Sequence, residues 1–142
     1  MSNNKDYTLI DINNNSKILT NIVTFFNSFH TGTHISYVIN SSYPIFKDNT
    51  YLYLLYYSTD IFTHLGVYKL TGNRLYLYTF YWHLLKLFDG LFDKYNLLRK
   101  SKINKLEALI YLSGFLGLRG DYYYKLLGFY SFILAKSFKL TW

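Results

Sequence analysis

Histidine is the residue type in this chain with the widest chemical range, because a neutral imidazole can bind a metal ion and can exchange a proton near neutral pH. The chain has four histidines. His30 and His34 are four residues apart, a spacing that on a helix would let both rings bind one metal ion. Gly32 lies between them and is expected to break the helix, and no third ligand is near in the sequence. We therefore interpret both residues as surface or helix-cap residues.

The other residues that could do chemistry are dispersed along the chain. Asp60, His64 and His83 are interpreted as isolated, and the sequence does not place a serine, a histidine and an acid in nucleophilic roles. The absence of cysteine excludes disulfides, thiolate metal ligands and cysteine nucleophiles. The sequence therefore predicts a protein that is not an enzyme, with no cofactor, no metal site and no small-molecule substrate.

One segment carries a resemblance to a catalytic motif. Residues 111–120, Tyr-Leu-Ser-Gly-Phe-Leu-Gly-Leu-Arg-Gly, resemble a homing-endonuclease helix motif in which a carboxylate near the end binds the catalytic metal. Gly117 and Arg119 stand where acids would be needed. Because a guanidinium group cannot ligate Mg²⁺, we do not expect nuclease activity.

The charge of the chain points to a polyanionic partner. Fifteen Lys and Arg face eight Asp and Glu, and the formal net charge of +7 favours RNA or an anionic membrane surface. A basic stretch without an intervening acid could bind phosphates, or it could be a solvated linker; it contains Lys94, Arg99, Lys100, Lys102 and Lys105. Residues 122–124, three consecutive tyrosines, could stack on nucleotides or pack partly into the core.

The composition indicates where the protein is made. Tyr, Phe, Asn, Ile and Lys are abundant whereas Pro occurs once, a bias typical of an AT-rich organelle genome. The N-terminal residues have neither the apolar segment of a secretory signal nor the arginine-rich character of an imported presequence. We therefore expect a protein encoded in the mitochondrial genome and located in the mitochondrial matrix.

No segment is expected to cross a membrane. The uncharged stretch 18–46 is interrupted by polar residues, and the apolar runs 108–118 and 126–135 are each about half as long as a bilayer span of about 20 residues. Arg119, Asp121 and Lys125 lie between these two runs. The sequence therefore predicts no transmembrane helix.

The elements expected in the first part of the chain are one helix followed by strands. Residues 1–15 are predicted to be a polar tail that is frayed or ordered by a partner. Apolar residues at three- and four-residue spacing predict a helix that Ser16 caps and Gly32 ends. A short β-type run follows at 35–39, with a turn around Pro44, and strand-forming residues recur at 50–57. A hairpin with arms 61–70 and 74–82 is expected around Thr71-Gly72-Asn73.

The second part of the chain is expected to be helical and then rich in strands. Residues 83–98 match helical spacing and run into the basic stretch. A strand is predicted at 108–113, a Gly-rich turn at 114–120 and a last strand at 131–138. Between them, Asp121 is expected to cap a short helix over 122–127 that Gly128 closes. The predicted fold is α+β: an N-terminal helix on a small antiparallel sheet, then a β-rich C-terminal lobe with a short helix.

The C-terminal residues resemble a known family. Residues 112–135 are similar in layout to the end of the small-subunit ribosomal protein eight family, which has a strand, a Ser-Thr-Ser-Lys-Gly loop, a Thr-Asp helix cap, a basic helix, a Gly-x-Gly-Gly-Glu-Ile turn and a last strand. Aligned without a gap, six positions agree: Ser113, Gly117, Asp121, Lys125, Gly128 and Ile133.

The resemblance extends upstream and also has departures. Residues 67–78 resemble the family's hairpin, with Lys69, Thr71 and Tyr78 on its basic, hydroxyl and aromatic positions. The loop Thr, Ser and Lys are replaced by Gly114, Phe115 and Leu116, and the turn Glu by Phe132. Phe115 could stack on an unpaired base, or it could bury with Leu116 while the backbone contacts RNA.

The resemblance implies a structural constituent of the mitochondrial small ribosomal subunit that binds the central domain of small-subunit rRNA beside neighbouring mitoribosomal proteins. It divides the chain into a tail (1–15), an N-terminal α/β lobe (16–82), a helical and basic insertion (83–107) and a C-terminal rRNA-binding lobe (108–142). The alternative is a non-catalytic accessory subunit of a mitochondrial inner-membrane respiratory or ATP-synthase complex. The residues expected to contact RNA are Lys69, Arg74, Arg99, Lys100, Ser113, Gly114, Phe115, Gly117, Lys125, Ser131 and Lys136.

Overall fold

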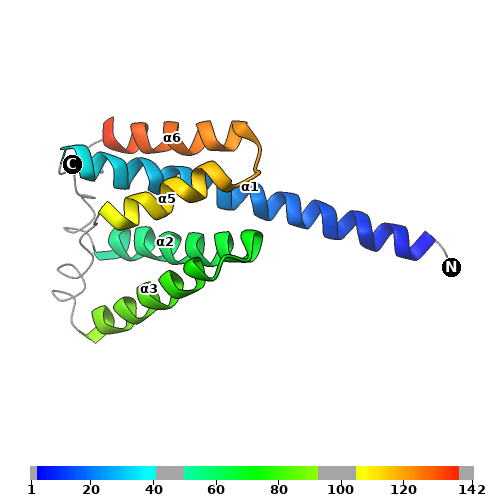
Figure 1. Ribbon diagram of the computed structural model, residues 1–142, viewed down its shortest axis with the longest axis horizontal. Coiled ribbons are helices and arrows are strands. Elements are labelled where there is room, and N and C mark those ends of the chain that lie inside the picture. The colour runs from blue at the N-terminus through cyan, green and yellow to red at the C-terminus, as the bar shows by residue number, and fades with distance from the viewer. Residues whose placement is uncertain (1–2, 41–49, 93–104, 138–142) are drawn as a thin grey trace.

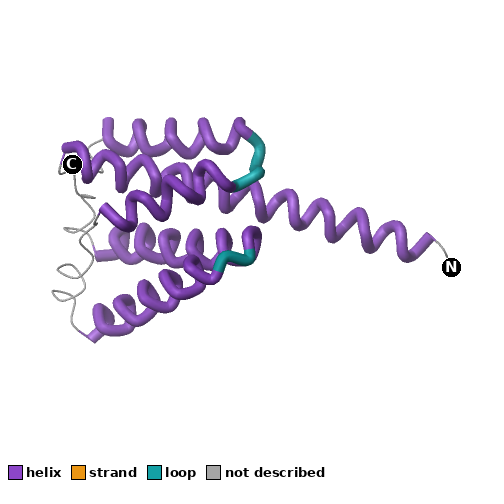
Figure 2. The backbone as a smooth tube through the Cα atoms, viewed as in Figure 1, coloured by secondary structure: helices purple, strands orange, loops and turns teal. Residues whose placement is uncertain are grey.

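The protein is a bundle of α-helices. The computed structural model describes residues 3–40, 50–92 and 105–137, and within these ranges it contains five α-helices and no strand (Figure 1, Figure 2). The predicted α+β fold, with its antiparallel sheet and β-rich C-terminal lobe, is therefore wrong, and the division of the chain into lobes stays a prediction. The helices are α1 (Asn3–Asn40), α2 (Thr50–Thr71), α3 (Arg74–Phe92), α5 (Lys105–Gly117) and α6 (Tyr122–Ser137).

Helix α1 is the central element of the bundle. It packs against α6, α5 and α2, and α2 packs in turn against α3. The N-terminal half of α1 extends beyond the other helices, whereas its C-terminal half lies between α6 and the α2–α3 hairpin (Figure 1). Helix α1 therefore connects α5 and α6 to the α2–α3 hairpin.

The predicted first helix is too short at both ends. Helix α1 begins at Asn3, so residues 3–15 are helical rather than a frayed tail, and it continues through Gly32 to include the run at 35–39. Gly32 does not end the helix; it lets α1 and α6 approach closely, because a Cβ at this position would lie 2.7 Å from the ring of Phe132 on α6. The predicted turn around Pro44 lies outside the described residues.

The turn at Gly72 is confirmed, but helices and not strands flank it. Gly72 has φ of +70°, and its N–H donates to the carbonyl of Tyr68, which is a left-handed helix end. Asn73 then caps α3, since its side-chain oxygen accepts from the N–H of Leu75 at 3.0 Å. Both the type I′ hairpin and this helix end require a residue at positive φ, so the turn residues alone could not distinguish them.

Hydroxyl side chains help to explain why the strand-forming residues are helical. Thr63 and Thr71 on α2 donate to the carbonyls four residues earlier, at 2.7 Å each. This pattern satisfies the hydroxyl within the helix itself, so that Thr does not need a sheet neighbour. Aromatic and β-branched residues have only a weak preference for strands, which tertiary packing overrides here.

The C-terminal elements are also helices. The predicted strand 108–113 and the first part of the predicted turn 114–120 belong to α5, and the predicted strand 131–138 belongs to α6 as far as Ser137. The cap at Asp121 is confirmed, because its Oδ1 accepts from the N–H of Tyr123 at 3.1 Å. Gly128 does not end the helix; it lies where α6 meets the backbone of Phe25 on α1.

The bundle has small apolar clusters between its helices. The larger one draws residues from α1, α2, α3, α5 and the α5–α6 connection: Val23, Val67, Tyr76, Ile110 and Leu118. None of the described helices is both long enough and apolar enough to cross a membrane.

Candidate metal centre

All four histidines of the chain are buried inside the bundle. His30, His34, His64 and His83 expose 0%, 1%, 1% and 3% of their surface. Asp60, which is 4% exposed, lies among them. The interpretation of His30 and His34 as surface or cap residues is therefore wrong. A continuous helix through Gly32 is the reason, because it turns both rings toward the same interior.

The four histidines, Asp60 and Glu107, called here the histidine cluster, come from four helices: α1, α2, α3 and α5. The i, i+4 spacing of Asp60 and His64 places both side chains on one face of α2. His83 comes from α3, which the turn at Gly72 folds back along α2, and Glu107 comes from the first turn of α5. The tertiary structure thus joins residues that the sequence separates.

Three donor groups converge most closely. The Nε2 atom of His64 lies 3.4 Å from Oδ1 of Asp60, and the Nε2 atom of His83 lies 3.4 Å from Oδ2 of the same carboxylate. One ligand atom from each of these three residues fits within 4.8 Å of the others. Asp60, His64 and His83 therefore have the arrangement of a metal-ligand set, called here the triad.

Hydrogen bonds fix which nitrogen of each imidazole carries the proton. His83 Nδ1 lies 2.7 Å from the carbonyl of Thr79, so this nitrogen donates and Nε2 keeps its lone pair in the neutral ring. The hydroxyl of Thr79 donates to the carbonyl of Tyr76, which leaves it as an acceptor for Nδ1 of His64 at 2.8 Å. In the neutral form of either ring, Nε2 is therefore the nitrogen without a proton, and it faces the carboxylate. Such outer hydrogen bonds are typical of metal-binding histidines.

The charges of the histidine cluster favour a bound cation. Burial lowers the pKa of His83, and it lowers the pKa of His30 to about 3, so both rings are neutral at pH 7. Burial alone would raise the pKa of Asp60, but its interactions with His83 and His64 hold it well below its usual range. Burial would likewise raise the pKa of Glu107, but His34 and then His83 lower it. Two carboxylates are thus held in the ionised form inside the bundle.

The separations within the triad are longer than those of direct hydrogen bonds. Charge-assisted N–H···O bonds are about 2.7–2.9 Å long, shorter than the two separations of 3.4 Å in the triad. Oδ1 of Asp60 and Nε2 of His64 are buried and have no hydrogen-bond partner in the described part of the chain. Two ligands on a tetrahedral ion at about 2.0–2.1 Å are about 3.3–3.4 Å apart. Each 3.4 Å separation in the triad is of this size, although the two involve different oxygens of Asp60, and one donor atom from each residue lies within 4.8 Å of the others.

Aromatic rings surround the histidine cluster. Tyr111 of α5 is 1% exposed and packs against His34 and His64, with ring centroids 4.5 Å and 5.1 Å apart. The rings of His64 and His83 lie 4.5 Å apart. This packing restricts the imidazoles and excludes bulk water, conditions that strengthen electrostatic interactions.

The residues predicted as an RNA-contact loop are part of α5. Ser113 pairs with the hydroxyl of Tyr76 at 2.6 Å, and Gly114 is buried where a Cβ would meet the side chain of Asn27. Phe115 packs edge-to-face with Phe129, with centroids 5.1 Å apart. Gly117 is exposed at the end of the helix. The predicted loop between a strand and a helix is therefore wrong, because its residues extend a packed helix.

The basic residues predicted to contact RNA are spread over several elements. Lys69 and Arg74 are exposed on the two sides of the turn at Gly72. On α6, Lys125 Nζ donates to the carbonyl of Phe115 at 2.6 Å, and Lys136 Nζ lies 3.5 Å from the hydroxyl of Ser36. Ser131 is half-buried on the same helix. Arg99 and Lys100 lie outside the described residues, and RNA contact by all of these stays a prediction.

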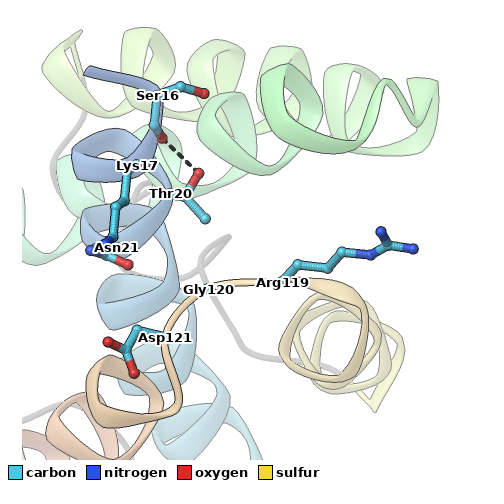
Figure 3. Close-up of a pocket in the computed structure, with 7 residues that line it drawn as sticks. All are labelled: Ser16, Lys17, Thr20, Asn21, Arg119, Gly120 and Asp121. Atoms are coloured by element: carbon cyan, nitrogen blue, oxygen red, sulfur yellow. Dashed lines mark hydrogen bonds between the residues drawn. The ribbon is translucent and has the colours of Figure 1, made fainter. Parts of the chain in front are cut away.

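A polar pocket lies apart from the histidine cluster, between α1 and the α5–α6 connection (Figure 3). Its volume is about 430 Å³ and it is open to solvent. The side chain of Arg119 extends away from α1, so that it does not converge with Lys17 on one ligand position (Figure 3). The side chains that line this pocket therefore do not converge on one ligand position, as the donor atoms of the histidine cluster do. It is lined by Ser16, Lys17, Thr20, Asn21, Arg119, Gly120 and Asp121.

The triad had a weak signal in the sequence. Asp60 and His64 have the i, i+4 spacing of a helical ligand pair, and His83 lies beyond a confirmed turn. Interpreting residues 50–82 as strands removed that signal, because residues i and i+4 of a strand are about 13 Å apart and cannot bind the same ion. Glu107 had no local signal, since its approach to His83 depends on how α5 packs.

Comparisons with known proteins give no relative. No protein-family model, curated protein sequence or solved structure matches this chain. The geometry of the histidine cluster therefore carries the functional assignment.

Proposed function

We propose that this protein binds a divalent transition-metal ion inside its helical bundle through Asp60, His64 and His83. The observation that carries this proposal is the convergence of three buried donor atoms from α2 and α3 at ligand spacing. The carboxylate would supply negative charge, and the two imidazoles would supply their Nε2 lone pairs to the ion. The bundle supplies a dry environment in which a cation compensates buried anionic charge.

The donor set indicates the class of metal. Imidazole and carboxylate donors suit Zn²⁺, Fe²⁺, Co²⁺, Ni²⁺ and Cu²⁺, whereas Mg²⁺ and Ca²⁺ prefer oxygen ligands. Cu⁺ is less suited because the chain has no cysteine and soft sulfur ligands select that ion. Zn²⁺ accepts this combination of nitrogen and oxygen in four-coordinate geometry.

Thr79 supports the proposed site from outside the ligand set. Its backbone carbonyl accepts from His83 and its hydroxyl accepts from His64, so one residue orients both imidazoles. Fixing Nδ1–H in this way directs both Nε2 lone pairs toward the carboxylate of Asp60. Loss of an outer-shell partner typically costs about 10–100-fold in metal affinity, so Thr79 is expected to be a positioning residue.

The proposal is tested by titrating the full-length protein, after chelator treatment, with Co²⁺ and Zn²⁺ in a calorimeter. One ion should bind per chain, and Asp60→Asn, His64→Gln and His83→Gln should each lower the affinity by about 100-fold or more. His30→Gln is the matched control, since it also replaces a buried histidine but leaves the triad intact. Equal affinity of the wild type and all triad variants would refute the assignment, with circular dichroism checking that each variant is helical.

A second candidate function rests on the outer faces of the helices. Helices α3 and α6 expose large apolar side chains at helical spacing, among them Trp82 and Tyr130 at 59% and 60% exposure. Apolar surface of this extent is typical of a protein–protein interface. We propose on this observation that the protein is also a non-catalytic subunit of a larger assembly, in line with the accessory subunit of a mitochondrial inner-membrane complex expected as the alternative.

Sedimentation of the native, tagged protein from mitochondria tests this second proposal. Migration with a respiratory or ATP-synthase complex would support it. Migration with the small ribosomal subunit would instead support the ribosomal function that the sequence resemblance implies. Migration as a free 16.9 kDa chain would contradict both.

A further inference from the structure

The carboxylate of Glu107 lies beside the triad but comes from a different part of the bundle. Its Oε1 atom is 3.6 Å from Nε2 of His83, the same nitrogen that lies 3.4 Å from Oδ2 of Asp60. Two carboxylates therefore approach one nitrogen lone pair from two helices. That arrangement is repulsive for a neutral imidazole unless a cation binds among the three groups.

The other oxygen of Glu107 is directed to α1. Its Oε2 atom lies 3.7 Å from Nε2 of His34, whose Nδ1 donates to the carbonyl of His30 at 2.7 Å. This leaves Oε1 as the oxygen nearest the triad. The side chain is 13% exposed, so it is largely removed from water. Outer partners commonly orient ligating carboxylates, and His34 is the residue that Oε2 of Glu107 faces.

Charge balance favours the participation of Glu107. A divalent ion held by Asp60 alone would keep one positive charge inside the bundle, with the carboxyl group of Glu107 3.6 Å from Nε2 of the ligand His83. Ligation by both carboxylates neutralises the ion within its own coordination shell. Because uncompensated charge is costly in a buried site, the neutral arrangement is the more stable one. Oxygen from a carboxylate also completes a four-coordinate set with two imidazoles and Asp60.

We infer that Glu107 is the fourth ligand, so that metal binding ties α5 to the α2–α3 hairpin; this inference rests on the proposed metal site. The three ligands of the triad belong to the hairpin, whereas α5 packs on α1. The hydroxyl of Tyr76 on α3 donates to the carbonyl of Ile110 on α5, which already brings the two parts together. A metal–carboxylate bond adds a direct link one turn away. Occupancy of the site then controls how firmly α5 is held.

Two measurements on the full-length chain test the inference. Visible absorption of the Co²⁺ complex reports the coordination, because four-coordinate Co²⁺ absorbs far more strongly than five- or six-coordinate Co²⁺. Amide hydrogen exchange with and without Zn²⁺ reports the opening of α5. In the wild type, absorption should be strong and Zn²⁺ should slow exchange in α5 as well as in α2 and α3.

Glu107→Gln and Glu107→Asp separate ligation from charge. Both should lower Co²⁺ affinity by about tenfold or more and weaken the visible absorption, because the amide is a poor ligand and the aspartate is one methylene too short. Protection of α5 by Zn²⁺ should then disappear while protection of α2 and α3 remains. Lys105→Gln, an exposed change on the same helix, is the matched control and should behave like the wild type.

The outcomes distinguish the inference from the proposal on which it rests. If Glu107→Asp keeps the affinity of the wild type while Glu107→Gln loses it, the residue acts by charge and the fourth-ligand assignment is wrong. If both variants bind and protect α5 as the wild type does, the inference fails while metal binding by the triad stands. If Asp60→Asn and His64→Gln also bind normally, the metal site itself is refuted.

Discussion

The centre of the bundle and the outer faces of α3 and α6 differ in the kind of side chain that they carry. Among the described residues the fully buried ones are mainly His, Thr, Asn and Ser, whereas Trp82 and Leu85 of α3 and Tyr130 and Ile133 of α6 are at least half exposed. Ordinary globular proteins bury the apolar residues and expose the polar ones. In this protein the two regions reverse that pattern.

The partners proposed for the two regions are different. Buried polar groups are stable only when they are hydrogen-bonded or bound to a cation. Many of the interior hydroxyls donate to a carbonyl of their own helix, as Thr31 does to Asn27 at 2.6 Å. The donor atoms of Asp60 and His64 lack such a bond, and they carry the proposed metal. The exposed aromatic residues instead form the surface on which the proposed assembly with another protein rests, so the comparison connects the two candidate functions.

Acid should lower the free energy of unfolding more than any other change considered below, through the buried histidines. The pKa of His30 is lowered from 6.5 to about 3 by burial. The unfolded chain therefore binds the proton first, and stability is lost as the pH falls from about 6.5 toward 3. By linkage this histidine alone accounts for up to about 4 kcal/mol between pH 7 and pH 3. Urea unfolding of the metal-free protein should show this decline, and His30→Gln should reduce it. Equal stability at pH 7 and pH 4 would contradict the burial of a neutral ring.

Metal addition should stabilise the interior. Zn²⁺ at about 100 times its dissociation constant should add about 2.7 kcal/mol to the free energy of unfolding, because it binds the folded state. The melting temperature of the wild type should rise accordingly. Asp60→Asn should show no rise, and a variant of the outer face such as Trp82→Gln should show the full rise. An identical rise in Asp60→Asn would place the binding site elsewhere.

The turn at Gly72 belongs neither to the buried centre nor to the outer faces, so a substitution there gives a stability change with which the effects in both regions can be compared. A β-branched residue at φ of +70° is strained, so Gly72→Val should destabilise the protein by about 1–2 kcal/mol. A Cβ at this position meets no atom within 4 Å, so the effect would come from the backbone alone. Thermal unfolding measures it, and Asn at the same position should cost less. Unchanged stability of the valine variant would mean that the turn is misplaced.

The outer faces should tolerate polar substitutions with the smallest effect on stability. Tyr130→Gln on α6 and Trp82→Gln on α3 should each change the free energy of unfolding by about 0.5 kcal/mol or less, since both side chains are mostly in water. Their effect should appear in assembly, as reduced migration with the larger complex. A Tyr130→Gln variant that is strongly destabilised but still assembles normally would show that this side chain stabilises the fold and does not form the proposed interface.

Several local features could be predicted from the sequence. The turn at Gly72 and the cap at Asp121 are where the residue types placed them, because a positive φ and a free helix N-terminus select particular side chains. The helical spacing of residues 83–92 is also confirmed, within α3. Each of these features depends on neighbours within a few positions.

The sequence by itself determined the turns, the caps, the positive net charge and the absence of thiol chemistry, since these follow from residue type and short-range spacing. Only the tertiary structure decided that residues 50–82 are two helices, because runs of Tyr, Leu and Thr suit a strand or a helix until packing selects one. It alone also brought His83 and Glu107 to Asp60. Proximity across four helices depends on how α1 packs against its neighbours, and no local pattern of side chains encodes that distance.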